Sequence, residues 1–288
     1  MSALLLFMAI ILVSLNPVWI QLALWEGSSP LALIFWQAVF AASLFLLYAL
    51  WQRRLFSVKK GLHWPLLSLG LGFFLMALCF TLSLQRLSAS YTVMLFFSYP
   101  FFVLLGNALL FKAQLTRSAI VALLVLFSGV LVITWPQGGP EDGLGILLAL
   151  GAALAHAYFI LFSGRNAKHV SSLQVAMFAQ FGFFAAALLL APFLSGPVLM
   201  NPAGMKFGLI LAVLSSFIGF IMFVYGVAGL GANRAALFSV SNLPLSLLFS
   251  WLFLADTPGT RLLLGFVIIL AGLLLEASRP SFIHERQP

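Results

Sequence analysis

Ten stretches of mostly apolar residues alternate with short polar connections along the chain. Each stretch is about 20 residues long, which is the length that a helix needs to cross a hydrocarbon core of about 30 Å. The connections carry turn-forming residues, as in Ser28-Ser29-Pro30 and Asn201-Pro202. The pattern therefore predicts ten transmembrane helices, at residues 3–24, 31–51, 64–84, 88–111, 116–135, 144–163, 172–194, 204–228, 233–254 and 260–277.

The composition supports a lipid environment for these helices. Of the 288 residues, 63% are hydrophobic and only 7% are charged. A soluble domain has about 25% charged residues, so a chain this poor in charge cannot cover a surface that faces water. Residues 1–24 lack the basic start and the cleavage site of a signal peptide, and we expect this first helix to be retained. We predict an all-α integral membrane protein with lipid as its main surrounding partner.

The formal net charge of +8 reflects membrane topology and not nucleic-acid binding. The basic residues lie singly or in pairs between apolar runs, where the positive-inside rule places them. With the N-terminus in the cytoplasm, eleven of the 14 Lys and Arg residues fall on the inner side and three, Arg86, Lys206 and Arg261, on the outer side. We therefore predict that both termini are cytoplasmic and that the protein lies in the inner (plasma) membrane of a bacterium.

The two halves of the chain resemble each other. A shift of 143 or 144 residues aligns Gln37 with Gln180 and Gly129 with Gly272. It also aligns Pro100 with Pro244, with a slip of one residue inside the fourth and ninth helices. The alignment predicts two repeats of five helices each, at residues 1–140 and 141–288.

An odd number of helices in each repeat requires the second repeat to enter the membrane upside down. The basic connection at 53–60 corresponds to an uncharged stretch at 195–205, and Lys112 corresponds to the acidic Asp256. Inverted repeats are typical of secondary transporters, in which two exchangeable halves produce inward- and outward-facing states around one central site. The pattern thus favours transport by alternating access.

Two stretches at equivalent places in the halves carry a family resemblance. They read LQRLSASYTVMLFFSYPFFVLL and AGLGANRAALFSVSNLPLSLLF, and each combines a small-residue turn with a helix that has a proline near its middle. SLNPVWI in the first helix and LAHAYFILFSGR in the sixth are further points of similarity. Over nearly its whole length the chain resembles the drug/metabolite transporter superfamily, specifically its ten-helix exporters of EamA type. The resemblance implies export of amino acids, other small metabolites or drugs without ATP hydrolysis.

Three positions depart from the pattern of that family. His156 stands where the family often has tryptophan, and Gln37 stands where it often has arginine in the second helix. Lys112 stands where an acidic residue often follows the fourth helix. These departures affect the inferred substrate and coupling ion more than the inferred fold.

Several kinds of chemistry lack the residues that they require. The chain has no phosphate-binding loop with a Gly-Lys-Ser/Thr ending, no paired carboxylates and no His/Cys cluster, and Cys79 is the only cysteine. A primary pump or a membrane-embedded enzyme would need one of these groups. We therefore expect no enzyme activity, no metal and no other cofactor.

No Asp, Glu, Lys or Arg lies near the centre of any predicted helix. A charge costs several kcal/mol or more in hydrocarbon, so it is usually present only for a function. The absence argues against a polyanionic substrate such as a sugar phosphate, and against the membrane carboxylate of a proton-coupled cation exporter. A neutral or zwitterionic small molecule is the favoured substrate.

The first helix carries two candidate binding residues. The Asn16-Pro17 pair predicts a break in this helix, because Pro17 removes a backbone donor and frees a carbonyl. Asn16 supplies both a donor and an acceptor. Trp19 lies on the same face as Asn16, one turn later. These residues either line a cavity or pack between helices.

Paired candidates occur in both halves. Gln37 and Gln180 occupy equivalent positions, and a mid-membrane amide must find a partner in a watered cavity or on a neighbouring helix. Tyr99 and Asn242 lie beside the prolines of equivalent helices, where a kink can expose backbone to a cavity. Ordinary kinked packing is the alternative for that second pair.

Two further residues complete the candidate site. His156 is the one mid-membrane imidazole, and it would be the coupling group if transport proves proton-dependent. A neutral histidine that donates to a neighbouring helix is the alternative. Tyr225 in the eighth helix is expected to form an aromatic wall, and Phe80 is a weaker candidate for the same role.

Together these features predict a secondary transporter, an exporter of amino acids or similar neutral metabolites. The alternative is an uncoupled, channel-like facilitator of small neutral solutes, and a membrane-embedded enzyme ranks third. We expect a small-molecule substrate, protons as partners if transport is coupled to them, no nucleic acid, and a monomer or homodimer. The predicted substrate-binding residues are Asn16, Trp19, Gln37, Tyr99, His156, Gln180, Tyr225 and Asn242.

Overall fold

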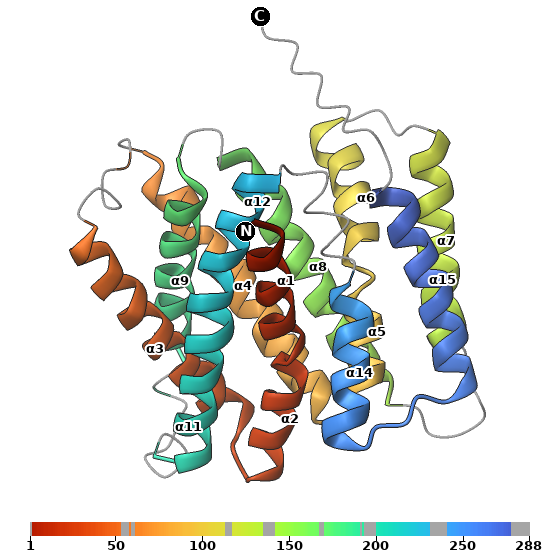
Figure 1. Ribbon diagram of the computed structural model, residues 1–288, viewed down its shortest axis with the longest axis horizontal. Coiled ribbons are helices and arrows are strands. Elements are labelled where there is room, and N and C mark those ends of the chain that lie inside the picture. The colour runs from red at the N-terminus through yellow and green to blue at the C-terminus, as the bar shows by residue number, and fades with distance from the viewer. Residues whose placement is uncertain are drawn as a thin grey trace, which may run out of the picture.

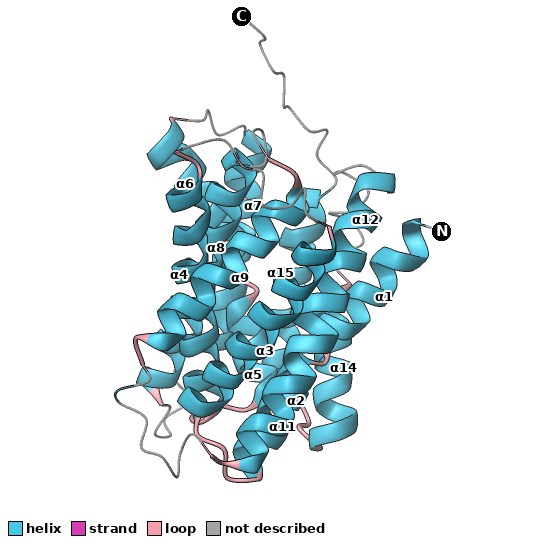
Figure 2. Cartoon of the chain, turned by 90° about the vertical axis from the view of Figure 1, so that its left-hand side faces the viewer, coloured by secondary structure: helices cyan, strands magenta, loops and turns pink. Residues whose placement is uncertain are grey.

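The fold is a bundle of helices, seen in a computed structural model that describes residues 2–52, 58, 61–112, 117–134, 142–166, 170–190, 192, 200–230 and 241–277. Every regular element among these residues is helical (Figures 1 and 2). In chain order the helices are α1 (Ser2–Ser14), α2 (Asn16–Trp25), α3 (Pro30–Trp51), α4 (His63–Leu84), α5 (Ala89–Phe96), α6 (Tyr99–Phe111), α7 (Arg117–Thr134), α8 (Gly143–Asn166), α9 (Ser172–Leu188), α11 (Pro202–Leu211), a π-helical segment (Ala212–Gly219), α12 (Phe220–Leu230), α14 (Asn242–Leu254) and α15 (Thr260–Ala277).

Six helical segments are long and apolar enough to cross a membrane. Shorter apolar helices follow at Leu173–Leu188, Asn242–Leu254 and Thr260–Gly272. Large apolar side chains cover the outside of the bundle. Four tryptophans lie at or near helix ends with exposed fractions of 50–79%, namely Trp25, Trp51, Trp64 and Trp251. Tryptophan at helix ends is typical of the membrane–water interface. The protein is an integral membrane protein, and the six segments are Ser2–Trp25, Pro30–Trp51, His63–Leu84, Ala89–Leu110, Gly143–Ser163 and Pro202–Phe223.

The helix boundaries lie close to the predicted ones, but three spans are irregular in the middle. The first is interrupted at Leu15, as the Asn16-Pro17 pair indicated, and the fourth is interrupted at Phe97 and Ser98. Pro17 and Pro100 have no N–H to donate to the carbonyl four residues earlier, which weakens the helix at these points. The eighth span comprises α11, the π-helical segment and α12, and its π-helical segment was not predicted. Residues 231–240, where the ninth helix was predicted to begin, lie outside the described residues.

The two halves of the chain are packed together by close helix crossings. Helix α4 packs against α8 and α9, and the eighth span packs against α1 and α3. Gly70 and Gly182 lie at the crossing of α4 and α9, where a Cβ on Gly182 would stand 1.9 Å from the carbonyl oxygen of Leu67. Small residues at such crossings let helix backbones approach closely in a membrane. The central contact between the halves therefore depends on these two glycines.

Helices α7 and α15 form a pair at one edge of the bundle (Figure 1). Gly129 of α7 contacts Ile269 of α15, and Gly272 of α15 contacts Leu126 of α7. Both glycines are separated by 143 residues, and so are Leu126 and Ile269. Exchanging α7 with α15 at an offset of 143 residues therefore converts the Gly129–Ile269 contact into the Gly272–Leu126 contact.

The lower end of the bundle is where α2 and α4 end and α8 and α11 begin (bottom of Figure 1). Here the Nζ of Lys206 lies 2.9 Å from the carboxylate of Glu26. The side-chain amide of Asn201 donates to the carbonyl of Gly27 at 3.0 Å. Both contacts join the first half of the chain to the second.

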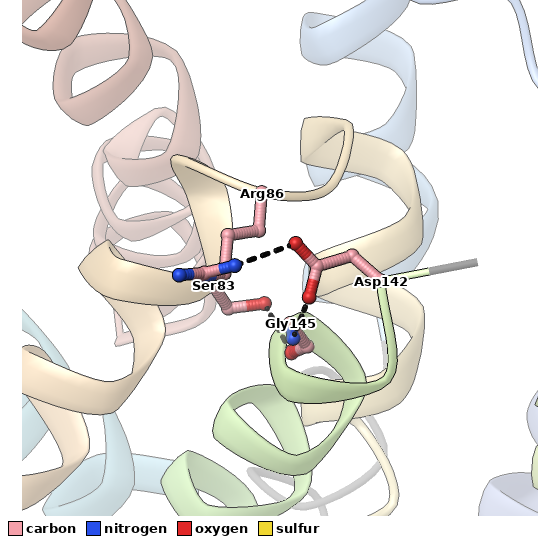
Figure 3. A network of polar contacts seen from close by, with 4 residues as sticks. All are labelled: Ser83, Arg86, Asp142 and Gly145. Carbon is pink, nitrogen blue, oxygen red and sulfur yellow. Dashed lines mark hydrogen bonds and ion pairs between the residues drawn. The ribbon is translucent and has the colours of Figure 1, made fainter. Parts of the chain in front are cut away.

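Two further contacts join the halves at this end. Arg86 donates to Asp142 at 2.7 Å, and Asp142 also accepts from the backbone N–H of Gly145 at 3.0 Å, which caps α8 (Figure 3). The Gly145 N–H and then the Arg86 side chain hold the pKa of Asp142 below its usual value, so this carboxylate is ionised at neutral pH. Asp256 accepts from the backbone N–H of Ser90 at 2.7 Å and so caps α5. We call these four interactions the lower-end contacts.

The predicted direction of the chain across the membrane depends mainly on basic residues that lie outside the described part of the chain. Most connections that carry the predicted cytoplasmic charges, such as 53–57 and 278–288, are among them. The lower end, which has Glu26, Asp142 and Asp256, corresponds to the predicted outer side. Helix α1 begins and α15 ends toward the opposite, upper end (Figure 1).

Candidate functional site

Two helix breaks and the π-helical segment lie at similar depths in the bundle. At a rise of 1.5 Å per residue, Leu15 lies about 15 Å from the lower end of its span and Ser98 about 14 Å from the start of α5. The π-helical segment begins about 15 Å from the start of α11. Broken helices and π-helical turns at mid-membrane are typical of functional sites in transporters.

A group of five polar side chains surrounds the break in the first span. Asn16 accepts a hydrogen bond from Ser215 of the π-helical segment. The hydroxyl of Ser14 lies 2.7 Å from the side-chain oxygen of Asn242 in α14, and the hydroxyl of Ser246 lies 3.1 Å from the same oxygen. We call Ser14, Asn16, Ser215, Asn242 and Ser246 the serine–asparagine cluster. It connects the first span to two spans of the second half.

Gln37 is bonded next to this cluster. Its amide donates to the hydroxyl of Ser216 at 3.3 Å, and both side chains are buried. Ser216 follows Ser215 in the π-helical segment, so this segment binds Asn16 through one serine and Gln37 through the next. Of the predicted residues, Asn16, Gln37 and Asn242 thus share one polar region.

A second group is aromatic and contains the predicted residues His156 and Tyr99. The ring of His156 in α8 lies 4.8 Å from that of Tyr99 and 5.2 Å from that of Phe96, measured between centroids. Phe159 stacks on His156 at 6.3 Å, and Phe80 contacts Phe96 at 5.3 Å. We call these five residues the aromatic group.

Three predicted residues have a buried polar atom without a partner among the described residues. The atoms are Nε1 of Trp19, Nδ1 of His156 and Oε1 of Gln180. A buried polar atom without a partner costs about 1–3 kcal/mol, and such atoms call for an explanation. A bound substrate or water would remove this cost. These atoms are therefore the strongest candidates for direct recognition.

The predicted offset of 143 residues pairs Gln180 with Gln37, but the positions around the two glutamines differ. Ser216 is the partner of Gln37, and the residue 143 positions before Ser216 is Phe73, which has no hydroxyl. In the same way, Phe159 corresponds to Asn16 and Gly72 to Ser215. The polar residues around Gln37 thus correspond to aromatic and small residues at the equivalent positions of the other half. The surroundings of the two glutamines therefore differ in chemistry.

Tyr225 does not lie with these residues, and its assignment to a central aromatic wall is corrected. Its side chain belongs to α12 and is 51% exposed. Its hydroxyl interacts with that of Tyr48, which lies near the upper end of α3. Tyr225 is only five residues from the end of α12, so it lies too near the end of its span to reach the middle of the membrane.

Sequence reasoning missed the serines that hold the asparagines and Gln37. Ser14, Ser215 and Ser216 were not predicted as site residues. The adjacent Ser215-Ser216 pair inside an apolar run was the one available signal, because neighbouring hydroxyls in a span need partners on other helices. Ser14 had no such signal.

Known proteins are similar to this chain in sequence or in fold. Uncharacterized transporter YcbK of Bacillus subtilis (strain 168) is 25% identical over 261 residues, which cover 86% of this chain and 83% of YcbK. Uncharacterized transporter YdfC of the same organism is 25% identical over 250 residues, which cover 86% of this chain and 81% of YdfC. A solved crystal structure superposes with a TM-score of 0.63 over 96% of both chains, at 18% sequence identity, so the fold is shared.

The family comparison covers nearly the whole chain. The sequence matches the EamA-like transporter family twice, at residues 1–135 and again at 143–277. The apolar helices, the broken spans and both matches agree with one another. The chain belongs to the EamA-like transporter family, and it is a membrane transporter.

Proposed function

We propose that this protein is a secondary transporter that exports amino acids or similar small neutral or zwitterionic metabolites. It crosses the membrane ten times as two inverted five-helix repeats and works by alternating access between them. The observation that carries the proposal is that Trp19, His156 and Gln180 each bury a polar atom with no partner among the described residues, in a bundle whose spans are irregular at mid-depth. Among the described residues the charged side chains lie at helix ends, so recognition uses neutral groups.

The packing of the helices supports two exchangeable halves. Exchange of the repeats turns the contact of α4 with α8 into that of the eighth span with α1, and both contacts occur. It likewise turns the contact of α4 with α9 into that of the eighth span with α3. The α7–α15 pair reproduces itself at an offset of 143 residues. The two family matches also divide the chain between 135 and 143.

The proposed substrate site has two chemically different walls. The serine–asparagine cluster and Gln37 form the polar wall, and the aromatic group forms the apolar wall. Gln180 accepts from a donor of the substrate, such as an amino or hydroxyl group, and the indole N–H of Trp19 donates to a substrate oxygen. His156 acts as a neutral hydrogen-bonding group, because no carboxylate among the described residues lies beside it to stabilise the charged form. Tyr99 contributes its ring face.

The lower-end contacts identify the end of the bundle that has to open. They join the halves through two ion pairs and two hydrogen bonds, so a path from the site to the lower side requires the halves to separate there. Exposed ion pairs contribute at most about 1 kcal/mol each, so substrate binding can supply enough free energy to open them. The contacts thus suit a gate that opens and closes in each cycle.

Loss of the Gln180 acceptor should weaken transport. In Gln180→Leu we expect the KM for export to rise about tenfold, because a hydrogen bond in a dry site contributes about 1.4 kcal/mol. The substrate would be the compound that most stabilises the purified protein in a thermal screen of amino acids and other small neutral metabolites. Transport would be measured in reconstituted vesicles. His156→Gln, measured between pH 5.5 and 8, would show whether the imidazole carries protons or only binds substrate.

Gln52→Leu is the matched control. Gln52 follows α3 at the upper end and is exposed, and its side chain donates to the hydroxyl of Tyr48 in its own helix. The same change of side chain there should leave the KM unchanged. Equal KM values for wild type, Gln180→Leu and His156→Gln would show that these side chains are structural and that the site lies elsewhere.

A further inference from the structure

The serine–asparagine cluster brings oxygen atoms together from three spans. Two hydroxyls, those of Ser14 and Ser246, lie 2.7 and 3.1 Å from the side-chain oxygen of Asn242. The hydroxyl of Ser215 contacts the side-chain oxygen of Asn16. The cluster thus contains five side-chain oxygens and no charged side chain.

Backbone oxygens add to this set at the break of the first span. The carbonyl of Asn242 lies 3.4 Å from the hydroxyl of Ser14, and the carbonyl of Leu12 lies 3.4 Å from that of Ser215. Pro17 has no N–H, so the carbonyl of Val13 lacks its helical donor. Helix α1 ends at Ser14 in mid-membrane, and a helix C-terminus carries about half a negative charge.

The serine protons do not block a cation at this place. The hydroxyl of Ser14 can donate to the carbonyl of Ile10, which lies 2.7 Å away, and that of Ser215 can donate to Leu12. A serine inside a helix can also donate to the carbonyl four residues earlier, which for Ser246 is that of Asn242. With the protons placed in this way, the lone pairs of all three hydroxyls and both side-chain amide oxygens are free to face an ion.

We propose that this cluster binds a sodium ion. Hard cations take oxygen ligands, and unwound backbone and half-helix C-termini hold such ions in transporters. A monovalent ion fits because the ligands are neutral, whereas protein sites for Ca²⁺ and Mg²⁺ include carboxylates. A small ion fits because the oxygens of Asn242 already lie 2.7 and 3.4 Å from the hydroxyl of Ser14, so potassium would have to spread them.

A bound sodium ion would link the two halves at mid-depth. Ser14 and Asn16 belong to the first half, and Ser215, Asn242 and Ser246 belong to the second. An ion that binds one arrangement of the halves better than the other shifts the balance between them. Sodium would therefore be a coupling ion of the export cycle, and this role rests on the proposed transport function. Binding of the ion itself does not rest on that function.

The test measures sodium binding without transport. The full-length protein would be purified without sodium, and its Tm would be followed while choline is replaced by sodium at constant ionic strength. We expect a saturable rise in Tm with sodium, as ligand linkage requires, and a much smaller rise with potassium. In Ser14→Ala and Ser246→Ala, the sodium concentration that gives half of the maximal rise in Tm should increase about tenfold, because each variant loses one ligand of the ion. Asn242→Ala should remove the rise.

Two hydroxyls outside the cluster provide matched controls. Ser43 and Ser128 are exposed on α3 and α7, and each donates to a carbonyl of its own helix at 2.8 Å. Ser43→Ala and Ser128→Ala should keep the sodium response of the wild type. Binding of radioactive sodium to the wild type and to Ser14→Ala gives a second reading that does not depend on stability.

Three results would overturn the proposal. They are a Tm that does not respond to sodium, an equal response to sodium and potassium, and a sodium response that the three cluster variants share with the wild type. The wild type could bind sodium, and the variants lose this binding, while the protein transports none of the screened compounds. That combination would count against the proposed transport function and not against the sodium site. A sodium-independent transport rate would overturn the coupling role.

Discussion

The variant Gly182→Ala should lose about 3 kcal/mol of unfolding free energy, because its new Cβ has no room at the crossing of α4 and α9. The added carbon would lie 1.9 Å from the carbonyl oxygen of Leu67, and a backbone atom cannot move aside as the end of a side chain can. Gly70 faces the same crossing, with 2.2 Å between its added Cβ and the backbone of Gly182. Chemical denaturation of the purified protein would measure the loss.

Gly151→Ala provides the control for this prediction. Gly151 lies on α8, where an added Cβ would be 3.6 Å from the sulfur of Cys79, an ordinary contact distance. The same change of one methyl group should there leave stability unchanged or raise it slightly, because alanine is the better helix former. An equal effect of both variants would mean that the helices do not cross as closely as described.

Cross-linking of the lower end should abolish transport. In a protein with Cys79→Ala, the pair Glu26→Cys and Lys206→Cys replaces the ion pair at the lower end, and both side chains are about half exposed. A short bifunctional thiol reagent would then hold the two halves together at that end. Because alternating access requires this end to open, we expect the cross-linked protein to have no transport activity.

The control for the cross-link is the same protein with each cysteine alone. Treatment of either single variant with the reagent should change the rate little, since a lone modified side chain at an exposed position joins nothing. A reagent with a disulfide in its spacer allows recovery of activity after reduction. Full transport by the cross-linked pair would mean that the lower end does not open during the cycle.

Much of the fold follows from local sequence. Apolar runs bounded by turn residues predicted nearly every described helix to within a few residues, because lipid requires both length and apolar character. Pro17 marked the break of the first span because it removes a backbone donor. The π-helical segment at Ala212–Gly219 has no such marker, since its one glycine is at the end, and it depends on packing with other spans.

The residues of the candidate site could be proposed from the sequence, but their contacts could not. A polar residue inside an apolar run is by itself a candidate functional residue, and this criterion selected Asn16, Gln180 and His156. Which residues meet depends on contacts far apart in the sequence, such as that between Ser14 and Asn242, which are separated by 228 residues. Tyr225 was wrongly assigned to the centre because its residue type suggested a binding site, whereas its position five residues from the end of α12 places it far from mid-membrane.

Counterflow in reconstituted vesicles tests most directly whether the protein is an alternating-access carrier. Vesicles would be loaded with an excess of the unlabelled compound found in the thermal screen, and entry of the labelled compound would be followed. A carrier exchanges one molecule for another across its two states, so we predict that the internal compound accelerates entry of the label and makes it accumulate transiently above equilibrium. Entry at the same rate with and without internal compound, and without accumulation, would contradict alternating access and indicate a channel-like facilitator.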